Sequence, residues 1–311
     1  MNIIIIDRVH EYLAKSLTKA GFNVSDKQNI EPKNILAILK NYEGIIIRSK
    51  IKLTEEILSD LPNLKFIARV GAGMESIDEK AAEKLNIKLL NAPEGNRDSV
   101  GEHALGMILS LFNKICTANI QVKSGIWQRE PNRGIELMGK TVGIIGYGNM
   151  GGAFAKRLSG FGANVIAYDK YKTNFSDEYC QEVDLQTIFN ETDVLSLHVP
   201  LTKETFYLFD NSFINNFKKA FYLINTARGK IVKTTDLVEN IKSKKILGSA
   251  LDVLEYEKVS FEKLSLNNNK EINYLINAEN VIMSPHIAGL THDSNFKLAE
   301  VTAQKIINLF S

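Results

Sequence analysis

Four polar residues could together carry out proton transfer and anion binding: Arg228, Asp252, Glu257 and His286. Each lies at or just after the end of an apolar run of the kind that forms a buried strand. A histidine can donate or accept a proton near neutral pH, and a neighbouring carboxylate orients its ring. An arginine binds a carboxylate through two hydrogen bonds. With a nicotinamide cofactor, these groups suit hydride transfer at a carbon that bears a hydroxyl beside a carboxylate.

Each of these residues also has a purely structural interpretation. Arg228 could form a surface ion pair, and Glu257 lies in a charged run where solvated side chains are common. Asp252 and His286 could simply cap the turns that follow their strands. Two further histidines are interpreted as structural, His103 and His198. Spacing alone leaves this choice open.

A glycine-rich segment predicts the dinucleotide site that such chemistry needs. The run 141–145 is typical of a buried strand, and Gly146, Gly148 and Gly151 follow it before a helix. The first glycine permits a tight turn, the second lets backbone approach a pyrophosphate, and the third lets the helix lie close to the strand. The helix N-terminus offers N–H groups and the positive end of its dipole to the phosphates.

Asp169 favours one dinucleotide over the other. It ends a second predicted strand, 164–168, where a carboxylate accepts hydrogen bonds from the adenosine ribose. Because a carboxylate here repels a 2′-phosphate, the sequence predicts NAD rather than NADP, although Lys170 could attract such a phosphate.

Composition excludes several classes of protein. A chain of 311 residues with 44% hydrophobic residues predicts about two domains with full cores. The net charge of +2, without a long run of one sign, argues against a nucleic-acid partner. Cys116 and Cys180 have neither metal nor redox spacing, which predicts reduced thiols in a cytoplasmic protein without a bound metal. No apolar run is long enough to span a membrane.

Alternating strand and helix patterns predict an α/β fold with two doubly wound parallel sheets. Strands are expected at 3–6, 44–48, 64–69, 87–91, 141–145, 164–168, 193–200, 221–225, 247–253 and 280–284. One long apolar helix is expected from Ser99 to about Lys123, and an irregular polar insert over 258–277. The final helix, about 294–310, is expected to pack on the N-terminal domain, so that the cleft lies between the two domains.

Several motifs, in this order along nearly the whole chain, resemble the D-isomer-specific 2-hydroxyacid dehydrogenase family, and within it the short phosphoglycerate dehydrogenases. They are 69–73, 91–96, Trp127, 136–146, 225–229, 250–253 and 285–289. The resemblance implies a flavodoxin-like substrate domain, 1–97 and 285–311, into which a Rossmann NAD-binding domain, 98–284, is inserted. It also implies that an arm, 114–138, joins two chains into a homodimer.

The resemblance assigns roles to the polar residues. It implies that His286 transfers the hydroxyl proton, that Glu257 holds its imidazole, and that Arg228 binds the substrate carboxylate. The loop Gly71-Ala72-Gly73 would supply N–H groups to that carboxylate, and Asp252 would face the nicotinamide carboxamide. Further cofactor contacts are implied at Asn149, Met150, Asp169, Val199, Thr226, Ala227, Arg228, His286 and Gly289.

The chain also departs from the family pattern. Lys258 follows Glu257 where the family usually has a proline, so the loop that carries Glu257 is expected to be less rigid. No regulatory domain follows the last helix, so feedback by serine is not expected.

Extra arginines favour a phosphorylated substrate. Arg48 and Arg69 end strands of the first domain, and Arg129 and Arg133 lie in the arm. A dianionic phosphate suits arginine forks, so we expect oxidation of D-3-phosphoglycerate to 3-phosphohydroxypyruvate. A glyoxylate/hydroxypyruvate reductase or another D-2-hydroxyacid dehydrogenase is the alternative. A corepressor-like protein that senses NAD is an alternative of another class, because such relatives keep the same polar residues.

Overall fold

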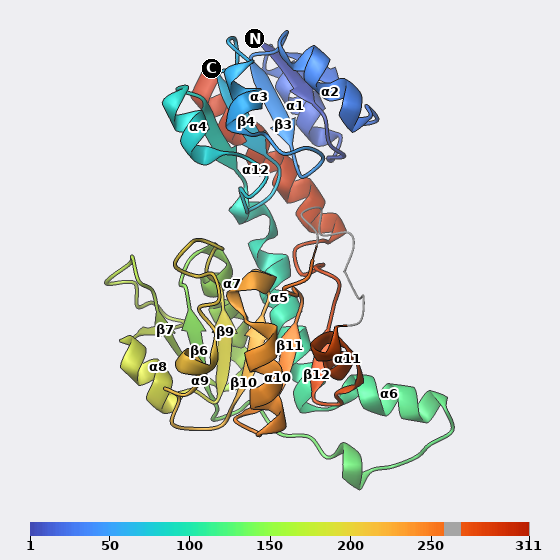
Figure 1. The fold of residues 1–311 in the computed structure, drawn as a ribbon, viewed down its shortest axis with the longest axis vertical. Coiled ribbons are helices and arrows are strands. Elements are labelled where there is room, and N and C mark those ends of the chain that lie inside the picture. The colour runs from blue at the N-terminus through green and yellow to red at the C-terminus, as the bar shows by residue number, and fades with distance from the viewer. Residues whose placement is uncertain (258–268, 311) are drawn as a thin grey trace. The chain divides into compact units, whose positions relative to one another are not determined.

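The computed structural model describes residues 1–257 and 269–310, which form two compact units (Figure 1). The first unit comprises Met1–Arg97 and the chain from Leu290 onward, and the second comprises Asp98–Gly289. The second unit is therefore inserted into the first in sequence. It extends through Gly289, somewhat beyond residue 284, the end expected from the sequence.

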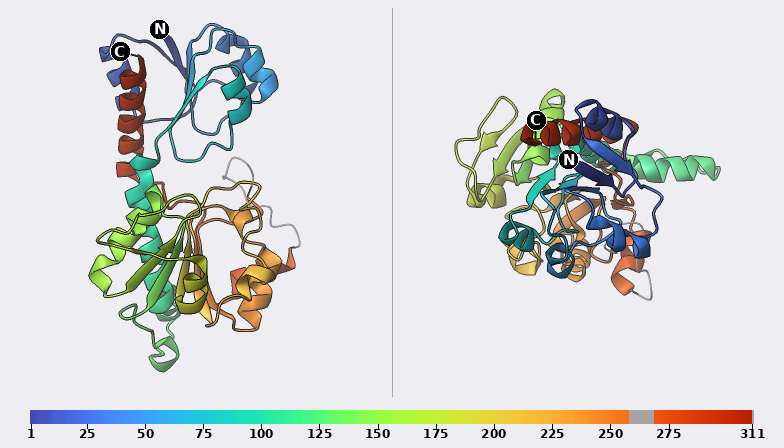
Figure 2. Two further views of the ribbon diagram at one scale, coloured as in Figure 1. Left: turned by 90° about the vertical axis from the view of Figure 1, so that its left-hand side faces the viewer. Right: turned by 90° about the horizontal axis from the view of Figure 1, so that it is seen from above.

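The first unit is built on a five-stranded parallel sheet in the order β2-β1-β3-β4-β5. Its strands are β1 (Asn2–Ile5), β2 (Asn23–Asp26), β3 (Gly44–Ile47), β4 (Phe66–Arg69) and β5 (Lys88–Asn91). Its helices are α1 (Tyr12–Lys19), α2 (Pro32–Leu39), α3 (Glu55–Ser59), α4 (Glu79–Lys84) and α12 (His292–Phe310). The isoleucines of β1 and β3 are fully buried because helices cover both faces of the sheet (Figure 2).

Helix α12 packs on this first sheet, as its apolar spacing predicts. Leu298, Ala303 and Ile306 share one buried cluster with Ile3 and Ile5 of β1. The approach is close, because a Cβ at Gly95 would lie 2.7 Å from the Cα of Leu298.

The second unit is built on a seven-stranded parallel sheet in the order β12-β11-β10-β9-β6-β7-β8. Its strands are β6 (Thr141–Ile145), β7 (Asn164–Tyr168), β8 (Gln181–Glu182), β9 (Val194–Leu197), β10 (Phe221–Asn225), β11 (Ile246–Leu251) and β12 (Val281–Met283). Its helices are α6 (Ile115–Lys123), α7 (Asn149–Leu158), α8 (Leu185–Glu191), α9 (Asn211–Ile214), α10 (Thr234–Lys242) and α11 (Lys270–Asn277), and α5 (Pro93–Phe112) enters from the first unit. Two parallel-sheet α/β domains, as predicted, are thereby confirmed.

The prediction of one helix from Ser99 to Lys123 is wrong. The chain forms α5 and α6, bent by 62°, and the left-handed residue Lys114 (φ 50°) lies between them. The carbonyl of Phe112 at the end of α5 accepts the N–H of Ile135 at 3.1 Å, so a distant segment contacts this end of the helix. Over the described residues no single helix is long and apolar enough to cross a membrane, although the bent pair meets that test by length and composition.

Two edge strands, and a helix within the expected insert, were not predicted. β2 and β8 are short and polar, so neither shows an apolar run. Part of the expected insert, residues 258–268, lies outside the described residues. Its remainder is not irregular but forms α11, whose N-cap Asn269 accepts the N–H of Ile272 at 3.0 Å.

Candidate active site

The strand order of the second unit reverses at β6, because β7 lies on one side of it and β9 on the other. Ligands of open α/β sheets bind at such a switch point, outside the carboxyl ends of the strands. The glycine segment begins at the carboxyl end of β6, so the structure places the predicted cofactor residues at this edge.

The glycine turn has the shape that a pyrophosphate needs. Gly146 has φ +94°, and a Cβ there would lie 2.7 Å from the carbonyl oxygen of His198. A Cβ at Gly151 would lie 2.2 Å from the Gly146 oxygen, so α7 packs directly on the turn. A Cβ at Gly148, by contrast, would meet no atom within 4 Å, and no side chain caps α7. Open space and uncapped N–H groups therefore meet at the helix N-terminus.

Asp169 is bound to this turn. Its Oδ2 accepts the backbone N–H of Tyr147 at 2.9 Å, and its Oδ1 accepts those of Tyr171 (2.9 Å) and Lys172 (3.1 Å). The ammonium of Lys172 donates to the carbonyl of Tyr147 at 2.9 Å. The residue expected at the ribose is thus held by the two loops that a dinucleotide would contact.

Arg228 lies on a turn that Asn225 organises at the end of β10. The Asn225 side chain accepts the N–H of Ala227 at 3.1 Å and donates to the carbonyl of Arg228 at 3.0 Å. The hydroxyl of the preceding Thr226 is buried and lacks a hydrogen-bond partner among the described residues, which fits its expected contact with a cofactor. A Cβ at Gly229 would lie 2.0 Å from the Leu254 oxygen, so the turn also contacts the chain that leads to Glu257.

The structure brings His286 and Glu257 together, although 29 positions separate them in sequence. Nδ1 of His286 lies 2.7 Å from Oε2 of Glu257, and both side chains are mostly buried. Oε1 of Glu257 accepts the N–H of Leu254, so the carboxylate is anchored on its own turn. A carboxylate on Nδ1 fixes the orientation of the ring, so the proton transfer expected of His286 would use Nε2.

Asp252 holds the loop that carries His286. It is almost fully buried and accepts the N–H groups of Ile287 (2.9 Å) and Ala288 (2.8 Å) and the hydroxyl of Ser284 (2.6 Å). Burial by itself would raise the pKa of Asp252, but hydrogen bonds from His103, Ser284 and the two N–H groups outweigh it and lower that pKa. His286 itself is left-handed (φ 57°), a conformation that its surroundings must stabilise.

One face of α5 supports the same loop. Nε2 of His103 lies 2.9 Å from the Ser284 hydroxyl and 3.5 Å from the Asp252 carboxylate. One turn earlier in the helix, the hydroxyl of Ser99 donates to the carbonyl of Ala288 at 2.6 Å. Ser99 and Ser284 were not singled out from the sequence. The spacing of four between Ser99 and His103 indicates a common helix face, but nothing in it identifies their partners.

The predicted substrate residues of the first unit lie at the carboxyl ends of β3 and β4. Nε of Arg69 donates to the carbonyl of Arg48 at 3.3 Å. A Cβ at Gly71 would lie 2.2 Å from Nη1 of Arg69, so this guanidinium folds over the Gly71-Ala72-Gly73 loop. A side chain at position 71 would therefore require this flexible guanidinium to move.

Asp7 shapes the loop that carries Arg48. One oxygen of its carboxylate accepts the N–H groups of Arg48 (2.6 Å), Ser49 (3.0 Å) and Lys50 (3.1 Å). Asp7 is buried at the end of β1, so the adjacent strand fixes this loop. The arm arginines differ, because Arg133 pairs with Glu130 at 2.8 Å and both side chains are exposed.

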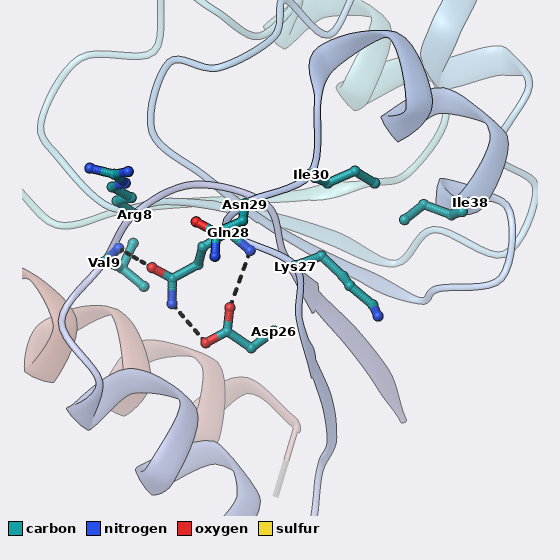
Figure 3. Close-up of a pocket in the computed structure, with 8 residues that line it drawn as sticks. All are labelled: Arg8, Val9, Asp26, Lys27, Gln28, Asn29, Ile30 and Ile38. Atoms are coloured by element: carbon teal, nitrogen blue, oxygen red, sulfur yellow. Dashed lines mark hydrogen bonds between the residues drawn. The ribbon is translucent and has the colours of Figure 1, made fainter.

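The first unit also contains a hollow of about 1070 Å³, which lacks a cluster of converging charged groups (Figure 3). It lies near the ends of β1 and β2, where Gln28 accepts the N–H of Val9 at 3.2 Å and donates to Asp26 at 2.7 Å. Figure 3 shows the side chains of Arg8 and Lys27 pointing away from each other. These two charged groups do not converge on a common point, so we assign the hollow no function.

Comparison with known proteins agrees with the geometry. Residues 105–288 match the family described as "D-isomer specific 2-hydroxyacid dehydrogenase, NAD binding domain". The D-3-phosphoglycerate dehydrogenase of Archaeoglobus fulgidus is 35% identical over 311 residues, covering 99% of this chain and 57% of that protein. The hydroxypyruvate reductase of Thermotoga maritima is 34% identical, covering 96% of both chains. This chain therefore spans little more than half of the first relative and nearly all of the second.

A solved structure has the same fold along the whole chain. The D-lactate dehydrogenase of Aquifex aeolicus, in complex with NAD and lactic acid, is 32% identical, with a TM-score of 0.81 and coverage of 98% of this chain and 94% of that one. The family description names NAD, and the glycine turn, the uncapped α7 and Asp169 fit this dinucleotide. The chain belongs to the D-isomer-specific 2-hydroxyacid dehydrogenase family, a family of oxidoreductases that act on small 2-hydroxy and 2-keto acids, and its second unit is an NAD-binding domain.

Proposed function

We propose that the protein oxidises D-3-phosphoglycerate to 3-phosphohydroxypyruvate, or runs this reaction in reverse. The observation that carries the dehydrogenase part of the proposal is the 2.7 Å contact between His286 Nδ1 and Glu257 Oε2 at the end of the NAD-binding sheet. A bound NAD supplies the hydride acceptor. Nε2 of His286 takes the hydroxyl proton, and the Glu257 carboxylate stabilises the resulting imidazolium.

In this proposal the remaining residues bind and orient the substrate. Arg228 binds its carboxylate and polarises the carbonyl of the keto acid. The Gly71-Ala72-Gly73 loop contributes N–H groups, and Asp252 faces the nicotinamide carboxamide while it holds the His286 loop. The further proposed cofactor contacts are at Gly146, Gly148, Asn149, Met150, Gly151, Asp169, Val199, Thr226, Ala227 and Gly289.

The phosphate of the substrate is the finer part of the proposal. Arg48 and Arg69 are supported by their shared position at the ends of paired strands, since Ile47 is in register with Arg69. Arg133 is the weakest of the four arginines because Glu130 already neutralises it. Relatives of similar identity are named as phosphoglycerate dehydrogenase and as hydroxypyruvate reductase, so the two activities are the competing outcomes.

Specificity constants separate these outcomes. D-3-phosphoglycerate is compared with D-glycerate, and phosphohydroxypyruvate with hydroxypyruvate. We expect the phosphorylated acids to be preferred, and Arg48→Ala and Arg129→Ala each to remove part of that preference while activity on the unphosphorylated acids stays nearly unchanged. Arg8→Ala is the matched control, because it removes an exposed arginine of the first unit that we assign to no site.

Two results would contradict the proposal in different ways. If the phosphate confers no advantage, the protein is better described as a hydroxypyruvate/glyoxylate reductase. If no acid in a broad panel is turned over while NADH still binds, the protein is better described as a binding protein that senses the dinucleotide on the same scaffold.

A further inference from the structure

Tyr207 adopts an unusual backbone conformation close to the catalytic turns. It lies on the loop after β9, and its φ is 53°. Left-handed backbone is uncommon for a bulky residue other than glycine and persists only where its surroundings stabilise it. Two sets of contacts do so here, one through the backbone and one through the phenol.

The backbone of this loop runs along the turn that follows Arg228. The N–H of Tyr207 donates to the carbonyl of Lys230 at 2.9 Å, and that of Phe209 donates to Ile231 at 3.0 Å. The backbone N–H of Lys233 in turn donates to the carbonyl of Phe209 at 3.1 Å. The loop after β9 is therefore attached to the loop that carries Arg228.

The phenol reaches the other catalytic segment. The Tyr207 hydroxyl donates to Oε1 of Glu255, and Oε2 of Glu255 accepts the N–H of Thr234, at the start of α10, at 2.9 Å. The hydrogen bond to Glu255 raises the pKa of Tyr207 to about 12, so the phenol stays a neutral donor throughout the physiological range. Glu255 is two residues before Glu257 on the same turn.

These contacts join three loops at one place. A Cβ at Gly229 would lie 2.0 Å from the oxygen of Leu254 and 2.6 Å from the nitrogen of Glu255, so backbone meets backbone between the Arg228 turn and the Glu257 turn. Tyr207 spans both, because its N–H is bonded to the first and its hydroxyl to the second. Lys258 rather than a proline follows Glu257, so the latter turn lacks the restraint on its backbone that a proline would supply.

We propose that Tyr207 and Glu255 are positioning residues that hold Glu257, and through it the imidazole of His286, in register with Arg228. The proposal rests on the proposed function, in which these three groups act on one substrate. A misplacement of about 1 Å between reacting groups can cost on the order of 100-fold in rate. Loosening this anchor should therefore reduce turnover and leave cofactor binding unchanged.

Two substitutions separate the contact from the backbone strain. Tyr207→Phe removes the hydroxyl and keeps the ring, whereas Tyr207→Gly removes the contact and also relieves the left-handed strain. We expect both variants to lower kcat by about tenfold or more. The KM for NADH should stay within about twofold of the parent value. The glycine variant should lose less thermal stability than its lost contacts alone would predict, because it relieves the strain. Tyr274→Phe is the control, because it removes a tyrosine hydroxyl of the same unit away from these turns.

A double-mutant cycle tests the route through Glu255. If Tyr207 acts through this carboxylate, Tyr207→Phe should cost little once Glu255→Ala is present, so the two effects on kcat should be clearly non-additive. Additive effects, or unchanged kcat in both tyrosine variants, would overturn the inference. Glu257→Gln distinguishes this failure from failure of the proposed function. If it lowers turnover while the Tyr207 variants do not, only the inference is wrong, and if it is harmless, the assignment of Glu257 is wrong.

Discussion

The carboxylate of Asp169 accepts the backbone N–H of Tyr147 at 2.9 Å, so the residue that ends β7 is tied to the glycine turn that follows β6. The same carboxylate accepts two N–H groups from its own loop. Asp169 therefore has a structural role in addition to its charge. Any test of its part in cofactor choice has to separate these two contributions.

Asp169→Asn removes the charge and retains an acceptor oxygen for the turn, whereas Asp169→Ala removes both. We expect each variant to bind NAD more weakly than the parent and to narrow the gap between NAD and NADP, since the repulsion of the 2′-phosphate is gone. The amount by which the asparagine variant binds NAD more tightly than the alanine variant measures the structural contribution of the Asp169 side chain. The measurement is the dissociation constant of each dinucleotide. A parent protein that prefers NADP would contradict our interpretation of this residue.

His286→Ala should lower turnover by about two to four orders of magnitude, as expected when a general acid–base is lost. The KM for NADH should change little, because Asp252 still holds the loop through Ile287 and Ala288. Steady-state kinetics in both directions provide the test. His292→Ala is a control, since it removes a histidine to which we assign no role. Near-normal turnover without His286 would remove it from the mechanism.

Motifs that are contiguous in the sequence allowed the nucleotide site to be predicted. Contacts between segments that are far apart in the sequence could not be predicted in this way. Gly146 and Gly151 each meet a local steric demand that the spacing of the motif encodes, whereas Gly148 leaves open space at the N-terminus of α7. The contact of Tyr207 with Glu255 joins segments that only the sheet order brings together, and nothing in either segment indicates the other. In the same way, the carbonyl of Phe112 at the end of α5 accepts the N–H of the distant Ile135, and neither segment indicates this contact by itself.

The exposed apolar residues of α6 and the arm should form a homodimer interface. Trp127, Met138 and Ile120 are 78%, 71% and 64% exposed, which is unusual for side chains of this size unless another surface covers them. We expect a dimer by light scattering at micromolar concentration, and Trp127→Ser with Ile120→Lys to give a monomer. Leu85→Lys, an exposed leucine of the first unit, should leave the dimer intact. A monomeric parent protein would contradict this prediction.

His198 should make the stability of the protein depend on pH in the mildly acidic range. Its Nε2 lies 2.8 Å from the Ser196 hydroxyl, and its Nδ1 is shielded from solvent without a partner among the described residues. Burial lowers the pKa of His198 to about 4. Between that value and the ordinary value near 6.5, the unfolded chain binds a proton that the native protein does not, so the free energy of unfolding falls as pH decreases.

The size and the sign of this effect can both be measured. The loss should be absent above about pH 6.5 and complete below about pH 4, reaching roughly 3 kcal/mol for a shift of this size. Urea denaturation of the protein without cofactor, at intervals between these limits, gives the curve. His198→Gln cannot take up a proton and retains a polar contact with Ser196, so its curve should be flatter than that of the parent, and the difference between the two isolates His198 from the carboxylates. Parallel curves would show that the imidazole is protonated in the native state or that solvent reaches it.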